Sequence, residues 1–391
     1  MSSRQILIIG GSTRAAADSV RRAGWRPMCA DFFVDWDLQQ TAQTIPVRRY
    51  PESLPDDLAH IRADGWMYCG ALENEPQILS RILEENRNLG PLIGAHPETL
   101  AHVRNPSWIS SVLRAAGLPC LDVARQSAPP PPDSCWLQKP LSSAGGRQIR
   151  VWDEVAERSP FVEPHYFQRR VSGSELSVLF RCDEGKPPAW LGATRALRLA
   201  NPLPAPTPYS YCGSTGPVTD LPDHIVRSIT EIVTTIVSQT SGLNGLVGFD
   251  FIEDPQHAWL LEINPRYTAS VEVLELASGR SLLSPQPVSC QAVSGRVESG
   301  RDHGTSENHQ QRIVAKQILY AVESISAPEL RHYFRSIDPW QTPIVTDIPQ
   351  VPLTIDAGWP ICTVFAEGSD PVAVEEMLRM RGEAVRSAIR A

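Results

Sequence analysis

Four polar side chains in the second half of the chain have the types and spacing of a cation site. Glu262 and Asn264 lie two residues apart in Trp259-Leu-Leu-Glu-Ile-Asn-Pro-Arg266, so a β-strand would place both on one face. Asp250 lies in the apolar stretch before them, and Arg266 continues the same spacing. Carboxylate and amide oxygens suit Mg²⁺, which commonly bridges substrate phosphates, with Mn²⁺ as an alternative ion. The pattern predicts a hairpin that holds a cation beside a guanidinium, as a phosphoryl-transfer step requires.

A second candidate site lies upstream, where a short apolar strand carries a lysine. Lys139 belongs to Cys135-Trp-Leu-Gln-Lys-Pro-Leu141, which runs into Ser142-Ser-Ala-Gly-Gly-Arg147. Gly145 and Gly146 would let backbone N–H groups turn toward phosphate oxygens. Taken alone, this segment also fits a hairpin turn with a solvated lysine, because it has no Walker A sequence of the Gly-Lys-Ser/Thr type.

A third stretch, His165-Tyr-Phe-Gln-Arg-Arg-Val-Ser-Gly-Ser-Glu-Leu-Ser-Val178, lies between the other two. Along the chain, the lysine-bearing strand and its loop come first, this stretch second and the acidic hairpin third. In that order, between about residues 100 and 280, the three stretches resemble the ATP-grasp superfamily and its biotin carboxylase-like branch. The resemblance implies two groups of nucleotide contacts. The phosphates would be bound by Lys139, Ser143, Gly145 and Gly146. The adenine edge would pair with the backbone around Arg169 and Val171, its amino group would meet Gln168, and the ribose hydroxyls would meet Glu175.

The same resemblance implies an ATP- and Mg²⁺-dependent carboxylate ligase. Asp250, Glu262 and Asn264 would hold Mg²⁺, while Lys139 and Arg266 would offset charge on the transferring phosphoryl group. ATP would convert a substrate carboxylate into an acyl phosphate, and an amine would displace the phosphate. The chain is similar to predicted ATP-dependent carboligases, a group that includes the tyramine–glutamate ligase of methanofuran biosynthesis. Amide formation in one-carbon cofactor synthesis is therefore one expected role.

Two alternatives stay open. In the first, bicarbonate is the carboxylate and the reaction is a carboxylation through carboxyphosphate. In the second, the protein binds nucleotide for regulation without turnover. The second is motivated by one departure from the family pattern: Asn105-Pro106 stands where Asp-Lys usually precedes a helix, so a lysine contact to phosphate is missing. Arg104 is the cation that would replace it. Asn105 as N-cap and Pro106 in the first turn still predict a helix start.

Composition excludes several classes of function. The net charge is −8 with no basic block, which argues against nucleic acid and against an anionic membrane surface as partners. The sequence has no apolar stretch of transmembrane length and no signal-peptide core. Its eight cysteines include no Cys-x-x-Cys pair, which argues against structural zinc or a disulfide framework. We expect a cytoplasmic enzyme with small-molecule carboxylate and amine substrates, compatible with a homodimer.

The expected fold combines α/β and α+β parts. Gln5-Ile-Leu-Ile-Ile-Gly-Gly11, a helix over 12–23 and a strand ending at Asp31 predict a Rossmann-like βαβ unit. Residues 10–13, at the start of that helix, could bind an anionic group or form only a tight strand-to-helix turn, and residues 73–75 are candidate substrate contacts. The expected domains are an N-terminal α/β domain over 1–100, an ATP-grasp domain over 101–284, a mobile polar linker over 285–311, and a β-rich cap with a terminal helix over 312–391.

Overall fold

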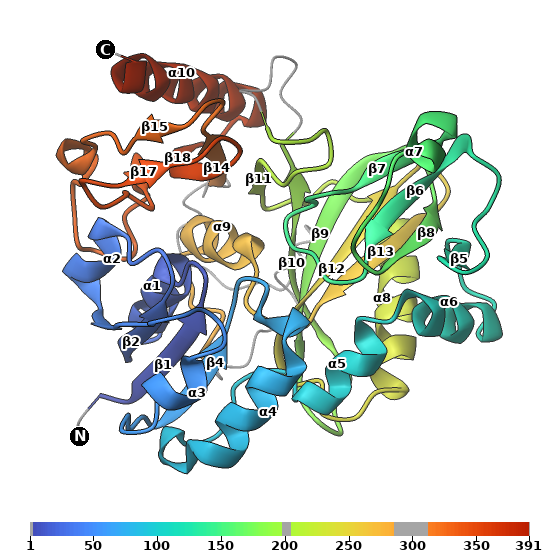
Figure 1. Ribbon diagram of the computed structural model, residues 1–391, viewed down its shortest axis with the longest axis horizontal. Helices are drawn as coiled ribbons and strands as arrows, with labels where there is room; N and C mark the ends of the chain where they lie inside the picture. Colours follow the sequence, from blue (N-terminus) through green and yellow to red (C-terminus); the bar gives the residue numbers. More distant parts are fainter. Residues whose placement is uncertain (1–2, 198–204, 285–311, 391) are drawn as a thin grey trace, which may run out of the picture.

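The computed structural model describes residues 3–197, 205–284 and 312–390. In these ranges the strands form four sheets, of four, eight, two and four strands. Figure 1 shows the N-terminal sheet and the C-terminal elements on one side of the molecule and the strands from the middle of the chain on the other; the eight-stranded sheet runs across both sides. The expected combination of an α/β region with antiparallel sheets is confirmed. No helix in the described ranges is long and apolar enough to cross a membrane.

The N-terminal sheet is parallel and has the order β3-β2-β1-β4. Residues 6–9 of its central strand β1 are fully buried, because helices cover both faces of the sheet. One face packs against α1 and α2 and the other against α3 and α4. The strands are β1 (Gln5–Gly10), β2 (Arg26–Asp31), β3 (Gln43–Ile45) and β4 (Gly65–Tyr68), and the helices are α1 (Arg14–Arg22), α2 (Trp36–Thr41), α3 (Leu54–Asp57) and α4 (Pro76–Glu85).

Two helices, α5 (Pro97–Val103) and α6 (Pro106–Ala115), connect this region to the middle of the chain. The predicted start of α6 is confirmed: the Asn105 side chain accepts hydrogen bonds from the N–H groups of Ser107 and Trp108 at 3.0 and 3.2 Å. Because Pro106 disfavours helical backbone in the residue before it, the helical path breaks between Arg104 and Pro106. The break leaves Arg104 at the end of a short helix, where its side chain reaches the site described below.

The second four-stranded sheet is antiparallel and has the order β5-β8-β6-β7. Its strands are β5 (Val123–Arg125), β6 (Asp133–Pro140), β7 (Arg150–Asp153) and β8 (His165–Arg169), with the short helix α7 (Glu154–Arg158) after β7. Figure 1 shows this sheet beside the β12–β13 edge of the eight-stranded sheet. The two sheets therefore enclose the region in which the candidate residues lie.

The eight-stranded sheet has the order β13-β12-β9-β10-β11-β14-β18-β16. It consists of β9 (Ser174–Cys182), β10 (Ala189–Ala196), β11 (Gly213–Gly216), β12 (Gly245–Glu253), β13 (Ala258–Asn264), β14 (Ile313–Tyr320), β16 (Val345–Thr346) and β18 (Pro360–Gly368). The strands after residue 312 thus continue the sheet that carries the predicted hairpin. The predicted polar linker over 285–311 lies outside the described residues. A separate pair, β15 (Ile325–Ser326) and β17 (Thr354–Ile355), completes the strands.

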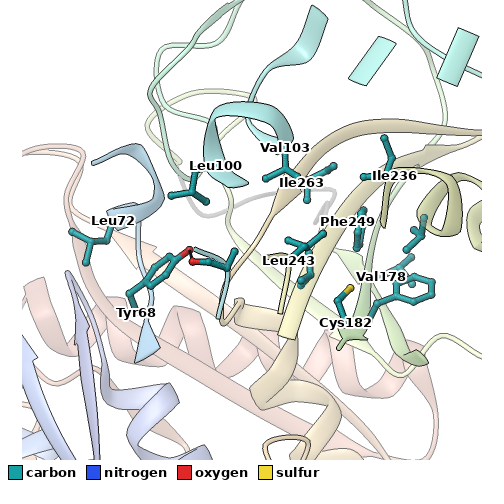
Figure 2. Close-up of a cluster of buried hydrophobic side chains, with 14 of the residues drawn as sticks. Tyr68, Leu72, Leu100, Val103, Val178, Cys182, Ile236, Leu243, Phe249 and Ile263 are labelled. Carbon is teal, nitrogen blue, oxygen red and sulfur yellow. Dashed lines mark hydrogen bonds between the residues drawn. The ribbon is translucent and has the colours of Figure 1, made fainter. Parts of the chain in front are cut away.

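Three long helices cover the large sheet. Helix α8 (Asp223–Ser238) buries an apolar stripe of Ile225, Ile229, Ile232, Val233 and Ile236 against one face. Helix α9 (Ala269–Ser278) packs on the opposite face, and α10 (Pro371–Arg390) packs against β14 and β18. Figure 2 shows that one apolar cluster joins the N-terminal region to the large sheet: Tyr68, Leu100 and Val103 lie in the same core as Phe249 and Ile263. This shared core fixes the N-terminal region relative to β12 and β13.

Candidate active site

The predicted cation-binding residues lie together at the edge of the large sheet. Asp250 of β12 pairs directly with Glu262 of β13, and Asn264 lies two residues further on. The Asn264 amide nitrogen donates to Asp250 Oδ2 at 2.7 Å and lies 3.4 Å from Glu262 Oε1. The three side chains therefore share one face of the sheet, as strand periodicity predicts.

Asp250 and Glu262 have different charged groups around them, and their pKa values shift in opposite directions. Burial raises the pKa of Asp250 to about 7, and the negative charge of Glu262 adds to the effect. Partial desolvation raises the pKa of Glu262, but the positive charges of Lys139 and Arg104 outweigh it and hold this pKa below its ordinary value. The Glu262 side chain is 41% exposed, so an ion can reach it.

The side-chain oxygens at this site could supply some, but not all, of the ligands of a hard cation. Two carboxylates and an amide oxygen are ligands that suit Mg²⁺, which keeps further positions for water and phosphate oxygens. The described ranges contain no group of three or more His, Cys, Asp or Glu side chains that could hold a metal ion. An ion at Asp250 and Glu262 would therefore depend on the Asn264 oxygen, on water and on a phosphorylated substrate for its remaining ligands.

Arg266 lies beside this carboxylate pair and is fixed by an acid from the N-terminal region. Its Nε donates to Glu73 Oε1 at 2.7 Å, and its Nη2 lies 3.4 Å from Asn264 Oδ1. Glu73 follows β4 in a short 3₁₀ turn, η1 (Leu72–Asn74), and is only 2% exposed. The Tyr68 hydroxyl lies 3.2 Å from the carbonyl oxygen of Pro265, which also ties the end of β4 to this segment. Glu73 thus holds the guanidinium beside Asn264.

The Lys139 side chain, from the second four-stranded sheet, lies close enough to Glu262 for their charges to interact. It lies near the end of β6, and its Nζ donates to Gln168 Oε1 of β8 at 3.0 Å. The Gln168 amide in turn donates to the Leu261 carbonyl of β13 at 3.1 Å, which joins the two sheets. Burial lowers the pKa of Lys139, but Tyr166 and Glu262 outweigh it and hold this pKa above its ordinary value. Lys139 therefore remains a cation.

The predicted phosphate loop, residues 142–147, lies across the site. The Ser143 carbonyl accepts hydrogen bonds from the side chains of Asn74 and Arg104 at 3.2 and 3.3 Å. The Gly145 carbonyl accepts one from the Tyr211 N–H at 2.9 Å. Gly145 and Gly146 have φ values of +64° and +74°, which favour glycine. The 142–147 loop therefore contacts the N-terminal region and the segment before β11.

Arg104 is also at this site. Its Nη1 lies 3.9 Å from Glu262 Oε2, and its Nη2 donates to Asn74 Oδ1 at 3.0 Å. Its Nε is buried without a hydrogen-bond partner in the described structure. Arg104 directly precedes Asn105-Pro106, the pair that stands in place of the usual Asp-Lys. Its guanidinium thus lies between the 142–147 loop and the carboxylate pair.

The predicted adenine and ribose residues follow β8 into β9. Arg169 ends β8, with its guanidinium 5.5 Å from the Trp136 ring, and Val171 lies in the connection to β9. Glu175 lies two residues before Ser177, which pairs directly with Asp250, so Glu175 is on the face of the carboxylate pair. The structure therefore places both the connection and Glu175 along one edge of the site.

Some residues of the site were not singled out as ligands from the sequence. The hydroxyl of Ser177 interacts with Asp250, and a chain of hydroxyls continues from Ser177 through Ser270 to Thr194 at 3.1 and 3.0 Å. The two-residue spacing from Glu175 to Ser177 was the available signal. At residues 10–13, where an anion could bind, the Asp31 carboxylate accepts the Thr13 N–H at 2.5 Å and lies at the start of α1.

Two antiparallel sheets thus enclose a lysine, two arginines and a carboxylate pair. Residues 108–270 match the family model described as an ATP-grasp domain, and the chain carries that domain. An uncharacterized protein of Methanocaldococcus jannaschii is 25% identical over 157 residues, which are 40% of this chain and 34% of that protein. The chain thus aligns with about a third of the length of that curated relative.

Solved structures share the fold over nearly the whole chain. The L-amino acid ligase of Bacillus licheniformis is 14% identical, with a TM-score of 0.65 and coverage of 98% of each chain. The biotin carboxylase domain of the Hydrogenobacter thermophilus 2-oxoglutarate carboxylase, solved with MgADP and bicarbonate, is 13% identical. Its TM-score is 0.65, with 96% of this chain and 89% of that chain covered. At these identities the likeness establishes the fold.

Proposed function

We propose that this protein is an ATP- and Mg²⁺-dependent ligase that activates a substrate carboxylate as an acyl phosphate and joins it to an amine. One observation carries the proposal. In a chain with an ATP-grasp domain, Lys139, Arg104 and Arg266 converge on the pair of Asp250 and Glu262 from three different parts of the fold. Three cations around two carboxylates suit a polyphosphate with a bound cation. The L-amino acid ligase and the biotin carboxylase domain that share the fold support this reaction class.

The chain's own residues would act by positioning and by charge. Asp250, Glu262 and Asn264 would hold Mg²⁺, or Mn²⁺ in its place, and the ion would supply charge neutralisation at the phosphates. Lys139 would contact phosphate oxygens from β6, and Arg104 would supply the contact that the absent Asp-Lys lysine makes elsewhere. Arg266, held by Glu73, would stabilise negative charge that develops on the transferring phosphoryl group.

The nucleotide base and sugar would lie along the connection from β8 to β9. The backbone around Arg169 and Val171 would pair with the adenine edge, and Glu175 would accept the ribose hydroxyls. Gln168 would reach the adenine amino group only by exchanging its hydrogen bonds to Lys139 and Leu261. Ser143, Gly145 and Gly146 of the 142–147 loop would cover the phosphates.

A phosphate-release screen with Mg-ATP tests the proposal. Amino acids and other small acids would be crossed with a panel of amines, and products identified by mass spectrometry. We expect release of ADP and phosphate that requires both an acid and an amine. Release with bicarbonate and no amine would instead assign carboxylation through carboxyphosphate. Tight nucleotide binding without release for any pair would assign the regulatory role. Amide formation in one-carbon cofactor synthesis and a cytoplasmic location belong to the same proposal.

A further inference from the structure

Four aromatic side chains meet at the carboxyl edge of the N-terminal sheet. They are Phe32, Phe33, Tyr50 and Trp359, which we call the aromatic cluster. The Phe32 ring lies 5.2 Å from Phe33, 5.6 Å from Tyr50 and 6.5 Å from Trp359, measured between ring centroids. Phe33 and Trp359 are 5.9 Å apart in an edge-to-face arrangement. These spacings are those of directly interacting rings.

The aromatic cluster is open to solvent. Phe32 is 48% exposed and Trp359 is 38% exposed. The rings come from three separate places in the chain: directly after β2, after β3, and in the turn before β18. A grouped apolar surface of this kind commonly marks a binding site, because exposing it to water is unfavourable.

Hydrogen bonds place the aromatic cluster next to the candidate active site. The N–H groups of Phe32 and Phe33 donate to the carbonyls of Gly10 and Gly11 at the end of β1. In open α/β sheets, ligands bind outside the carboxyl ends of the strands where the strand order reverses, and β1 lies at that point between β2 and β4. The rings therefore occupy the edge at which this half of the fold would receive a ligand.

Two links connect the aromatic cluster to the catalytic groups. The Tyr50 hydroxyl donates to the Gly70 carbonyl at 3.4 Å, three residues before Glu73, the partner of Arg266. On the other side, the Arg147 guanidinium lies 5.2 Å from the Trp359 ring and donates to the Gly358 carbonyl at 3.0 Å. The aromatic cluster is thus linked to the segment before Glu73 on one side and to the end of the 142–147 loop on the other.

The start of α1, close to the aromatic cluster, is already occupied by a carboxylate of the chain. The start of α1 would otherwise attract an anion, but Asp31 occupies it through its hydrogen bonds to the N–H groups of Thr13 and Val34. Asp31 directly precedes Phe32 in the chain. Asp31 is only 1% exposed, so beside the rings a substrate would meet aromatic faces and the Arg147 guanidinium that lies on Trp359.

We propose that the aromatic cluster is a specificity subsite for a planar aromatic ring carried by one of the two substrates. The inference rests on the proposed ligase function, because the ring belongs to the acid or to the amine that the enzyme joins. Phe32 and Trp359 would contact the ring, while Phe33 and Tyr50 support them from the sheet edge. The reacting group of the same substrate would extend past Tyr50 toward Arg266.

Binding of small probes to the full chain, without nucleotide, tests this subsite separately from turnover. The probes are 2-phenylethylamine and 3-phenylpropionate, each compared by titration calorimetry with its cyclohexyl counterpart of similar size. Replacing Phe32→Leu and Trp359→Leu, singly and together, keeps an apolar side chain but removes the ring. Leu353→Ala is the matched control, since Leu353 is also 48% exposed and lies outside the aromatic cluster.

We expect a phenyl probe to bind the wild type and the control alike, and to bind the double variant about tenfold more weakly or worse. The probe that binds, amine or acid, identifies which substrate carries the ring. Equal binding to wild type and double variant, equal binding of the cyclohexyl probe, or failure of both phenyl probes to bind the wild type would overturn the proposal. So would a wild-type dimer that the double variant loses, because the rings would then form a subunit contact. These readouts need no ATP, so they stand apart from a failed phosphate-release screen.

Discussion

The amide nitrogen of Asn264 donates to the carboxylate of Asp250 over 2.7 Å, so two of the expected cation ligands are hydrogen-bonded to each other. Asp250 and Glu262 face each other across β12 and β13, and the amide reduces their repulsion. A cation would take over that role, while Asn264 would present its oxygen in place of its nitrogen. A cation bound here would thus relieve the repulsion between the two carboxylates.

Replacing Glu262 tests this arrangement. Glu262→Gln keeps the size of the side chain but removes one of two charged ligands, so turnover of Mg-ATP should fall by about a hundredfold or more. Thermal unfolding should change little, because the side chain is 41% exposed. Glu367→Gln, on β18 of the same sheet and away from the site, is the control and should retain activity. Wild-type turnover with normal Mg²⁺ dependence in Glu262→Gln would show that the cation binds elsewhere.

The ribose contact gives a second prediction. Glu175→Ala removes a carboxylate on the face of the carboxylate pair, so the apparent KM for ATP should rise about ten- to a hundredfold. An ATP analogue without ribose hydroxyls should show a much smaller difference between the two proteins. Glu184→Ala, at an exposed position just beyond the far end of β9, should leave KM unchanged. Equal ATP affinity in wild type and Glu175→Ala would give Glu175 a structural role only.

The sequence predicts the hairpin well because strand periodicity is local. Glu262 and Asn264 share a face for the same reason that any residues two apart in a strand do, and the short turn over 254–257 joins their strand to its partner. The cap at Asn105 is likewise a local pattern, and the structure confirms it. Local spacing therefore accounts for the positions of the candidate cation ligands.

Other parts of the site depend on packing between distant segments. Arg266 and its partner Glu73 are 193 residues apart, and no spacing pattern links them. The position of Arg104 depends on the break between α5 and α6 and on the 142–147 loop beside it. The carboxylate that accepts the Thr13 N–H at the start of α1 likewise comes from the end of the next strand. Sequence reasoning proposed the ligands but not the residues that orient them.

A buried carboxylate between the N-terminal and C-terminal parts predicts a pH dependence of stability. Asp37 accepts the N–H groups of Asp347 and Ile348 at 3.0 and 2.8 Å. Burial raises its pKa to about 7, and the charge of Asp347 adds to the effect. Above about pH 4 the unfolded chain has lost the Asp37 proton, whereas the folded protein keeps it. Protonated Asp37 therefore contributes to the free energy of unfolding at low pH, and that contribution is lost as pH rises through about 7.

Asp37→Asn should remove that dependence. The free energy of unfolding of the wild type should fall by about 2 kcal/mol between pH 5 and pH 8, measured by urea denaturation. The variant should be less stable at pH 5, since an amide cannot accept both N–H groups, but its stability should change by less than half as much. Asp56→Asn, at an exposed carboxylate of α3, should follow the wild-type profile. Parallel profiles for wild type and Asp37→Asn would show that Asp37 is ionised in the folded protein at low pH.

The 142–147 loop should respond to nucleotide. Arg147 at its end is held by the Gly358 carbonyl and the Trp359 ring, and contacts to phosphates would hold the loop more firmly. Limited tryptic cleavage after Arg147 should therefore slow when a non-hydrolysable ATP analogue and Mg²⁺ are added. Lys139→Ala should weaken that protection. Cleavage at one rate with and without nucleotide would rule out closure over the phosphates.

Alanine substitutions at two adjacent glycines distinguish the effect of backbone strain from the effect of displacing the 142–147 loop. Gly145 and Gly146 both have positive φ, so alanine at either position brings a similar conformational cost of about 1 kcal/mol. A Cβ on Gly145 would meet nothing within 4 Å, whereas a Cβ on Gly146 would collide with the carbonyl oxygen of Tyr209. Gly146→Ala should therefore keep the 142–147 loop away from its observed position and lower kcat/KM for ATP about tenfold more than Gly145→Ala does. Steady-state kinetics of the two variants, with unfolding temperatures as a check on the fold, measure the difference. If both variants lost activity to the same extent, the contact with Tyr209 would have no part in catalysis and the effect would be backbone strain alone.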